Sequence, residues 1–161
     1  MKKSNIIIGY GNPDRGDDGV AYYIIQNFLS KKNDYLDQEI FSQEIIPLNS
    51  STDIWFNLQL VPEIAEFMGS YHHAIFIDAH TSEIAEEIQV EKLSADFQYS
   101  PFTHHITPQT CLALTKQMHG VVPISYLVSI LGNNFGFDNT LSSSTKLLAD
   151  KAILKINQLL E

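Results

Sequence analysis

Two neighbouring aspartates, Asp17 and Asp18, lie in a glycine-rich segment that could bind a cation. The segment, GYGNPDRGDDG at residues 9–19, directly follows an apolar run at residues 6–8. Glycine allows the backbone to adopt positive φ and to approach a ligand closely. Because two ionised carboxylates side by side repel each other, a metal ion, a cationic group or a helix N-terminus must offset the repulsion. We expect Asp17 to be the N-cap of the next helix and Asp18 to face the cation.

Two further residues could complete a metal site with Asp18. Asp78 ends an apolar run at residues 74–77, where an unpaired buried charge would cost several kcal/mol. His105 comes just before a helix that we expect to begin after Thr107. Two carboxylates and one histidine form an open ligand set suited to Zn²⁺, Ni²⁺ or Mn²⁺, with positions left for a substrate.

His80 lies two residues after Asp78 and has two interpretations. If the strand continues, His80 points to the same side as Asp78 and could orient a metal ligand. If the strand ends, His80 is a loop histidine that faces solvent. The sequence leaves both interpretations open.

Other site chemistries fit the residues less well. Asp14 occupies the place of the third glycine in a G-x-G-x-x-G fingerprint, and its charge would repel a dinucleotide pyrophosphate. The chain contains no G-x-S-x-G motif, so no serine-hydrolase elbow is expected. Cys111 shares an apolar helix face with Leu114 and Met118. We expect this cysteine in the core, because reactive thiols lie in polar, exposed surroundings.

The elements that must position these residues alternate along the chain. Apolar runs predict strands at residues 5–8, 39–46, 74–78, 88–91 and 124–131. Amphipathic spacing and capping residues predict helices at residues 17–30, 62–68, 108–119 and 142–160, and composition predicts a loop at 49–53. This alternation indicates an α/β fold, a parallel-dominated three-layer α/β/α sandwich. Because sites in such sheets lie at the carboxyl ends of the strands, the fold can bring Asp18 and Asp78 together.

Size, charge and cysteine content limit the class of protein. The 161 residues fit one domain spanning 1–161. The net charge of -9 argues against a nucleic-acid partner, and no apolar run has the length of a membrane span or a signal-peptide core. The single cysteine, Cys111, excludes an internal disulfide and favours the cytoplasm.

The chain resembles the hydrogenase maturation proteases in several blocks that follow one another in the family's order. Residues 7–20 are similar to the opening motif of that family. The motif usually continues with glycine at the next position, where this chain has Ala21. Residues 59–66 resemble its Q-L-x-P-E-L-A-E segment, with Val61 in place of a polar residue, whereas residues 42–56 match poorly. Further similar blocks are residues 76–79, 105–108, 112–114 and 120–128.

The resemblance implies an α/β/α sandwich around a twisted, mostly parallel sheet of the phosphorylase/hydrolase-like kind. It implies an endopeptidase that removes the C-terminal peptide of a [NiFe] hydrogenase large-subunit precursor after nickel insertion, with nickel as the recognition signal. The family's metal-contacting residues fall on Asp18, Asp78 and His105. With these residues we expect a supporting set, which comprises Gly9, Gly11, Asn12, Asp17, Gly19 and His80. Nickel would come from the substrate, zinc or another divalent metal could occupy the free protein, and we expect a monomer.

Two other functions remain as alternatives. A peptidyl-tRNA hydrolase also opens with a strand and G-x-x-N-P, but Asp17 and Asp18 stand where that family has its histidine and asparagine pair. The acidic net charge also opposes a tRNA substrate. A non-catalytic chaperone could use the same acids and His105 to bind nickel and dock on the precursor.

Overall fold

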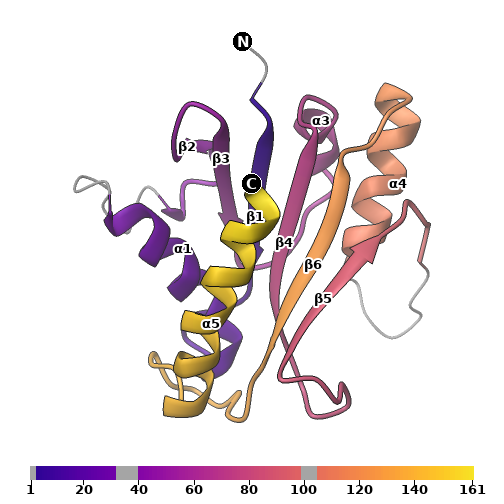
Figure 1. Ribbon diagram of the computed structural model, residues 1–161. Coiled ribbons are helices and arrows are strands. Elements are labelled where there is room, and N and C mark those ends of the chain that lie inside the picture. The colour runs from indigo at the N-terminus through magenta and orange to yellow at the C-terminus, as the bar shows by residue number, and fades with distance from the viewer. Residues whose placement is uncertain (1–2, 32–39, 99–104) are drawn as a thin grey trace.

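The computed structural model describes residues 3–31, 40–98 and 105–161, and its strands form one sheet in the order β2-β3-β1-β4-β6-β5 (Figure 1). The strands are β1 (Asn5–Tyr10), β2 (Ile46–Pro47), β3 (Thr52–Asn57), β4 (His73–His80), β5 (Ile88–Leu93) and β6 (Ile124–Leu131). The four central strands β3, β1, β4 and β6 are parallel, while β2 and β5 pair antiparallel at the two edges. The predicted parallel-dominated α/β sheet is confirmed.

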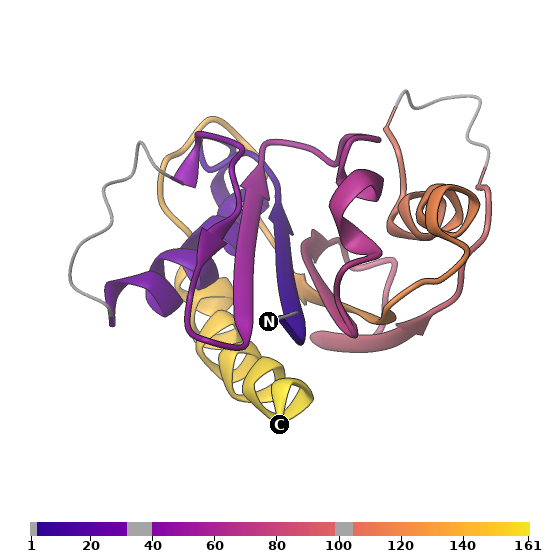
Figure 2. The same ribbon diagram turned by 90° about the horizontal axis from the view of Figure 1, so that it is seen from above.

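Helices cover both faces of this sheet (Figure 2). Helices α1 (Val20–Ser30) and α5 (Ser143–Leu160) lie on one face, and α3 (Ile64–Met68) and α4 (Pro108–His119) lie on the other. Alternate residues of β1 enter the two cores: Ile7 packs in the cluster with α1 and α5, and Ile6 and Ile8 pack in the cluster with α3 and α4. A continuous apolar strand is therefore buried on both faces, as in a three-layer sandwich.

Of the two helices after β5, α4 begins at the residue expected from the sequence and α5 begins one residue later, at Ser143. The Thr107 hydroxyl accepts a hydrogen bond from a backbone N–H in the first turn of α4, Pro108 is its first residue, and Gly120 ends it with φ 72°. Ser142 caps α5 in the same way as Thr107 caps α4. None of the helices in the described part of the chain is long and apolar enough to cross a membrane.

The strand predicted at residues 39–46 is wrong. Residues 40–46 are described, and of these only Ile46 lies in a strand, the short β2. The long strand of this region is β3, which begins within the predicted loop at residues 49–53. The buried carboxylate of Asp53 in β3 accepts hydrogen bonds from Lys3 Nζ at 2.5 Å and from Tyr71 Oη at 2.7 Å. Because these partners are distant in the sequence, the polar composition of the segment suggested a loop.

The parallel pairing of β1 with β4 brings their carboxyl ends together. Gly9 pairs with Ile77, so the next residues along, Tyr10 and Asp78, follow at the same end of the sheet. The glycine-rich segment leaves β1 at this end. The sheet therefore brings Asp78 next to that segment, as the carboxyl-end rule for parallel sheets predicts.

Candidate active site

The glycine-rich segment folds back on itself after β1. Gly11 has φ 138°, and a Cβ atom at this position would lie 2.2 Å from the backbone oxygen of Asp18. Gly19 is similarly close to Pro13, since a Cβ atom there would lie 2.7 Å from its Cα. Only glycine permits this φ and this close approach of backbone to backbone at position 11. The expected supporting role of Gly11 and Gly19 therefore has a steric basis.

Asp18 lies in the 3₁₀ turn η1 (Gly16–Gly19), which comes before α1 and replaces the first turn of the helix predicted from residue 17. Its side chain is half-buried. The backbone N–H of Asn12 donates a hydrogen bond to Asp18 Oδ2 at 2.7 Å. This bond and the close contact with Gly11 fix the carboxylate at the inner edge of the segment.

Asp17 does not cap the following helix as predicted. Gly19 is the N-cap of α1, and no side chain caps that helix. The Asp17 side chain is 0% exposed and instead accepts hydrogen bonds from the backbone N–H groups of Asn133, Asn134 and Ser142 and from the Ser142 hydroxyl. Burial alone would raise the pKa of this carboxyl, but these four hydrogen bonds together lower it below its usual value. Asp17 therefore joins the glycine-rich segment to the connection between β6 and α5.

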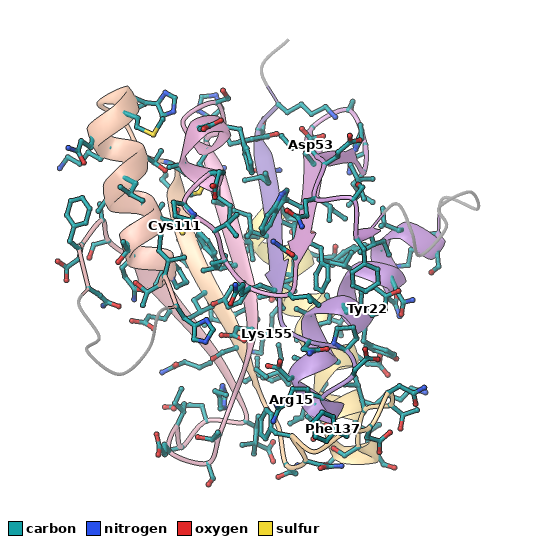
Figure 3. The ribbon with its side chains drawn as sticks, turned by 180° about the vertical axis from the view of Figure 1, so that it is seen from behind. Arg15, Tyr22, Asp53, Cys111, Phe137 and Lys155 are labelled. Atoms are coloured by element: carbon teal, nitrogen blue, oxygen red, sulfur yellow. The ribbon has the colours of Figure 1, made fainter. Side chains whose placement is uncertain are left out.

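A second set of contacts joins the same two segments. The backbone N–H of Gly16 donates to the carbonyl oxygen of Asp138 at 2.7 Å. The guanidinium of Arg15 lies over the ring of Phe137, 5.4 Å from its centroid, and both side chains are at the same end of the molecule in Figure 3. The segment that carries Asp18 is thus fixed by contacts with the connection between β6 and α5 as well as by its own turn.

Asp78 is half-buried near the carboxyl end of β4, on the face covered by α3 and α4. Its Oδ1 accepts a hydrogen bond from the backbone N–H of Ala79 at 2.7 Å, and the hydroxyl of Tyr10 donates another. Burial raises the pKa of Asp78 to about 7; the two hydrogen bonds oppose this rise, and the negative charge of Asp18 adds to it. The structure therefore brings Asp18 and Asp78 into electrostatic contact in a partly dehydrated setting.

Tyr10 is a site residue that was not predicted from the sequence. Burial raises the pKa of its hydroxyl well above the usual value, and the neighbouring carboxylates of Asp78 and Asp18 raise it further. Tyr10 therefore stays a neutral hydrogen-bond donor to Asp78. The sequence did contain a signal for Tyr10. Position 10 continues the alternation of Ile6 and Ile8 to the end of the strand, so its side chain lies on the same face of the sheet as theirs, beside the strand that Asp78 ends.

His105 is exposed, three residues before the first residue of α4. Within residues 3–31, 40–98 and 105–161, no three His, Cys, Asp or Glu side chains are grouped closely enough to hold a metal ion. The structure thus brings together the two predicted carboxylates but does not add His105 to them as a third ligand. A joint metal-binding role for the three residues stays a prediction.

His80 is buried, and both of its ring nitrogens have partners away from the carboxylates. Its Nδ1 is 2.8 Å from Ser129 Oγ in β6, and its Nε2 donates to the carbonyl oxygen of Glu86 at 2.7 Å. Strand β4 does continue to His80, but neither nitrogen is left to orient Asp78. We assign His80 to the packing of β4 against β6 in place of the expected supporting role.

Comparisons with known proteins identify the fold. No protein-family model matches the chain, and no curated protein matches it. Among solved structures, the hydrogenase maturating endopeptidase HybD from E. coli superposes with a TM-score of 0.70 at 15% identity, covering 98% of this chain and 91% of that chain. The [NiFe] hydrogenase maturation protease HycI from Thermococcus kodakarensis gives 0.65 at 16%, covering 99% and 93%.

A third structure agrees over almost the whole of both chains. The hydrogenase 2 maturation peptidase from Thaumarchaeota archaeon SCGC_AB-539-E09 has a TM-score of 0.62 and 16% identity, covering 98% of this chain and 98% of that chain. At such low identity the similarity concerns the fold, and it extends along the chain from the glycine-rich segment to α5. The chain therefore has the fold of the hydrogenase maturation endopeptidases.

Proposed function

We propose that this chain is an endopeptidase that removes a C-terminal peptide from the large-subunit precursor of a [NiFe] hydrogenase once nickel has been inserted. The observation that carries the proposal is the pair of carboxylates, Asp18 and Asp78, at the carboxyl ends of the central strands. The negative charge of Asp18 helps to raise the pKa of Asp78. A site that concentrates negative charge in this way favours a cationic ligand.

The cation in this proposal belongs to the substrate. Nickel held by the precursor would be contacted by Asp18 and Asp78, and by His105 from the start of α4. A divalent cation can polarise a scissile carbonyl and lower the pKa of a bound water. Recognition of nickel would restrict cleavage to precursors whose metal centre is complete. A zinc ion or another divalent ion in the free protein is a separate proposal, tested by metal analysis of the purified protein.

The chain's own residues prepare the carboxylates for such a ligand. Tyr10 and the Ala79 N–H each donate a hydrogen bond to Asp78, and the Asn12 N–H donates one to Asp18. These donors orient both side chains before the substrate arrives, so less ordering is needed on binding. We further propose that the protein acts as a monomer in the cytoplasm, where its single buried thiol needs no oxidising environment.

The test is cleavage of purified precursor, prepared with and without nickel and followed by mass spectrometry. The wild-type protein should release a C-terminal peptide only from the nickel-loaded form. We expect Asp18→Asn, Asp78→Asn and His105→Ala to lose at least about 100-fold in rate, the usual scale for groups that act on the reacting atoms. His72→Ala, which alters an exposed histidine at the amino end of β4, is the matched control and should cleave normally.

Each outcome has a defined meaning. Wild-type rates in one of the three variants would refute the role of that residue. A precursor of unchanged mass in a stable complex with the wild-type protein would refute the endopeptidase and favour a nickel-binding chaperone. Equal cleavage of nickel-free precursor would refute nickel as the recognition signal.

A further inference from the structure

A groove of 420 Å³ lies beside the glycine-rich segment, and neither Asp18 nor Asp78 lines it. Its walls come from the glycine-rich segment, α1, the stretch before β2, the turn after β3 and the connection before α5. We call it the Tyr22 groove and define it by six of its lining residues: Asn12, Asp14, Tyr22, Phe41, Leu58 and Asn139. Its volume is within the range of about 300 to 1,000 Å³ that is typical of ligand sites.

The floor of the Tyr22 groove is aromatic. The rings of Tyr22 and Phe41 stack with centroids 5.1 Å apart, and Phe56 packs against both. Phe41 is 41% exposed, and Leu58 on the wall is 48% exposed. Figure 3 shows where Tyr22 lies on α1. Apolar side chains gathered in a concave surface favour an apolar ligand group, because covering them removes that surface from water.

The rim of the groove is polar and acidic. Asn12 and Asn139 supply side-chain amides, and Asp14 supplies an exposed carboxylate. Among the described residues, the one ion pair joins Lys3 and Asp53, so Asp14 is not neutralised by a cation there. The whole chain has a net charge of -9. This charge favours a ligand with a basic group beside its apolar part.

The groove continues beyond the space of a single side chain. A second cavity of 260 Å³ borders it, and Pro13, Tyr22 and Asn139 line both. Two adjoining cavities lined by apolar and amide side chains suit an extended polypeptide, whose backbone can hydrogen-bond the amides while a side chain enters the apolar part.

Asn12 links the Tyr22 groove to the carboxylate pair. It lines the groove, and its backbone N–H donates to Asp18 Oδ2 at 2.7 Å. A polypeptide bound next to Asp18 would therefore need to extend only past Asn12 to enter the groove. The groove and the hydrogen-bonding environment of Asp18 therefore share one residue, Asn12.

We propose that the Tyr22 groove binds the precursor polypeptide next to the scissile bond, taking an apolar side chain over Tyr22, Phe41 and Leu58 and a basic group opposite Asp14. This inference rests on the proposed function for the identity of the polypeptide. Beyond that function, it names a second feature of the substrate that the chain would recognise besides nickel, namely an apolar side chain and a basic group near the scissile bond.

The test uses binding and cleavage as separate measurements. The probe for binding is a synthetic peptide that spans the scissile bond of the precursor, titrated into ¹⁵N-labelled protein and followed by NMR. We expect amide shifts at Asn12, Leu58 and Asn139, and about tenfold weaker binding by Leu58→Asp. Leu154→Asp is the matched control, because Leu154 is 65% exposed on α5, away from the groove, and should bind as the wild type does.

Two further changes do not depend on Leu58. Asp14→Asn should weaken peptide binding by about threefold and reduce its dependence on salt, as expected for an exposed charge. A peptide with its apolar residues replaced by serine should bind the wild-type protein about tenfold more weakly. In the cleavage assay, Leu58→Asp should raise KM and leave kcat close to the wild-type value.

The outcomes separate this inference from the proposed function. Leu58→Asp that binds peptide and cleaves precursor like the wild type would overturn the groove while leaving the endopeptidase intact. A wild-type protein that binds the peptide through the groove but cleaves nothing would support the groove and overturn the endopeptidase. Absence of wild-type binding at millimolar peptide would overturn the groove. A dimer that Leu58→Asp converts to monomer would also overturn it, because a second copy would then be the occupant.

Discussion

Asp17 and Ser142, 125 residues apart in the chain, are joined by two hydrogen bonds, from the Ser142 backbone N–H to Oδ1 at 2.7 Å and from the Ser142 hydroxyl to Oδ2 at 2.8 Å. Ser142 is the N-cap of α5, and Asp17 precedes Asp18. The buried carboxylate thus connects the start of the last helix to the segment that carries the candidate site residue. Four hydrogen-bond donors stabilise the negative charge of Asp17. Asp78, in contrast, lies near the negative charge of Asp18, which disfavours its ionised form.

The first prediction concerns the loss of this connection. In Asp17→Asn, the new amide nitrogen would face N–H and O–H donors and could accept from none of them. We expect a decrease of about 2 to 4 kcal/mol in the free energy of unfolding, since a buried polar group would lose its partners. Guanidinium unfolding measures this change. Asp138→Asn is the control, because Asp138 is exposed and, among the residues that the structure describes, its carboxylate accepts from Thr140 alone. Equal losses in both variants would contradict the prediction.

A second prediction compares two glycines with positive φ. Gly11→Ala places a Cβ atom 2.2 Å from the Asp18 carbonyl oxygen, whereas a Cβ atom at Gly120 meets nothing within 4 Å. Gly120→Ala should cost about 1 kcal/mol from backbone conformation alone and cleave normally. Gly11→Ala should cost more and lose most of its cleavage rate, because Asp18 must move. Melting temperature and cleavage rate test the pair, and normal cleavage by Gly11→Ala would show that the position of Asp18 is not critical.

The sequence predicted most of the fold because its signals were local. The apolar runs that became β1, β4 and β6, and the Thr107 and Ser142 caps, are all visible within a few residues of the chain. Strand β3 was missed because its polar residue Asp53 is satisfied by Lys3 and Tyr71, which are 50 and 18 residues away. A partly buried ion pair between residues so far apart has no local signature.

The same limit applies to the site. Asp18 and Asp78 were predicted together because Asp18 follows one strand of the parallel sheet and Asp78 ends another. The role of Asp17 was assigned wrongly, because its donors lie 116 to 125 residues further along the chain. The N-cap preference of aspartate is a local rule, and in this chain distant donors outweigh it. His80 was left open for the same reason, since its partners Ser129 and Glu86 become neighbours only in the folded sheet.

A third prediction follows from the pKa of Asp78, which burial raises to about 7 from a usual value of 3.8. Because the folded state binds this proton more tightly than the unfolded state, the contribution of Asp78 to stability is largest at low pH. It decreases as the pH rises from about 4 to about 7. Each pKa unit corresponds to about 1.4 kcal/mol, so the stabilising effect of Asp78→Asn should grow by roughly 2 to 3 kcal/mol between pH 5 and pH 8.

Chemical unfolding of metal-free protein at several pH values tests this dependence. The quantity compared is the difference in unfolding free energy between wild type and Asp78→Asn, which cancels the titration of other groups. Asp150→Asn serves as the control, because Asp150 is exposed and its carboxylate accepts from Tyr23 at the surface. A difference that is flat from pH 5 to pH 8 would show that Asp78 titrates normally in the folded protein.

The fourth prediction concerns Cys111, which is 0% exposed and lies on α4 beside the sheet (Figure 3). Burial raises the pKa of its thiol to about 12 from a usual 9.0. Three pKa units correspond to about a thousandfold less thiolate at neutral pH, and the thiolate is the reactive form. We therefore expect the native protein to react with iodoacetamide at least about a thousandfold more slowly than the protein unfolded in guanidinium.

Cys111 packs in the core with Ile8 and Leu112, so Cys111→Ala should keep its cleavage rate and lose about 1 to 2 kcal/mol of stability through the space left behind. The reactivity control combines Cys111→Ala with Asn157→Cys, which introduces a thiol at an exposed position on α5. That variant should be alkylated rapidly in the native state. If native Cys111 reacts as fast as this exposed thiol, or if Cys111→Ala abolishes cleavage, the thiol takes part in the chemistry and the carboxylate pair is not sufficient for it.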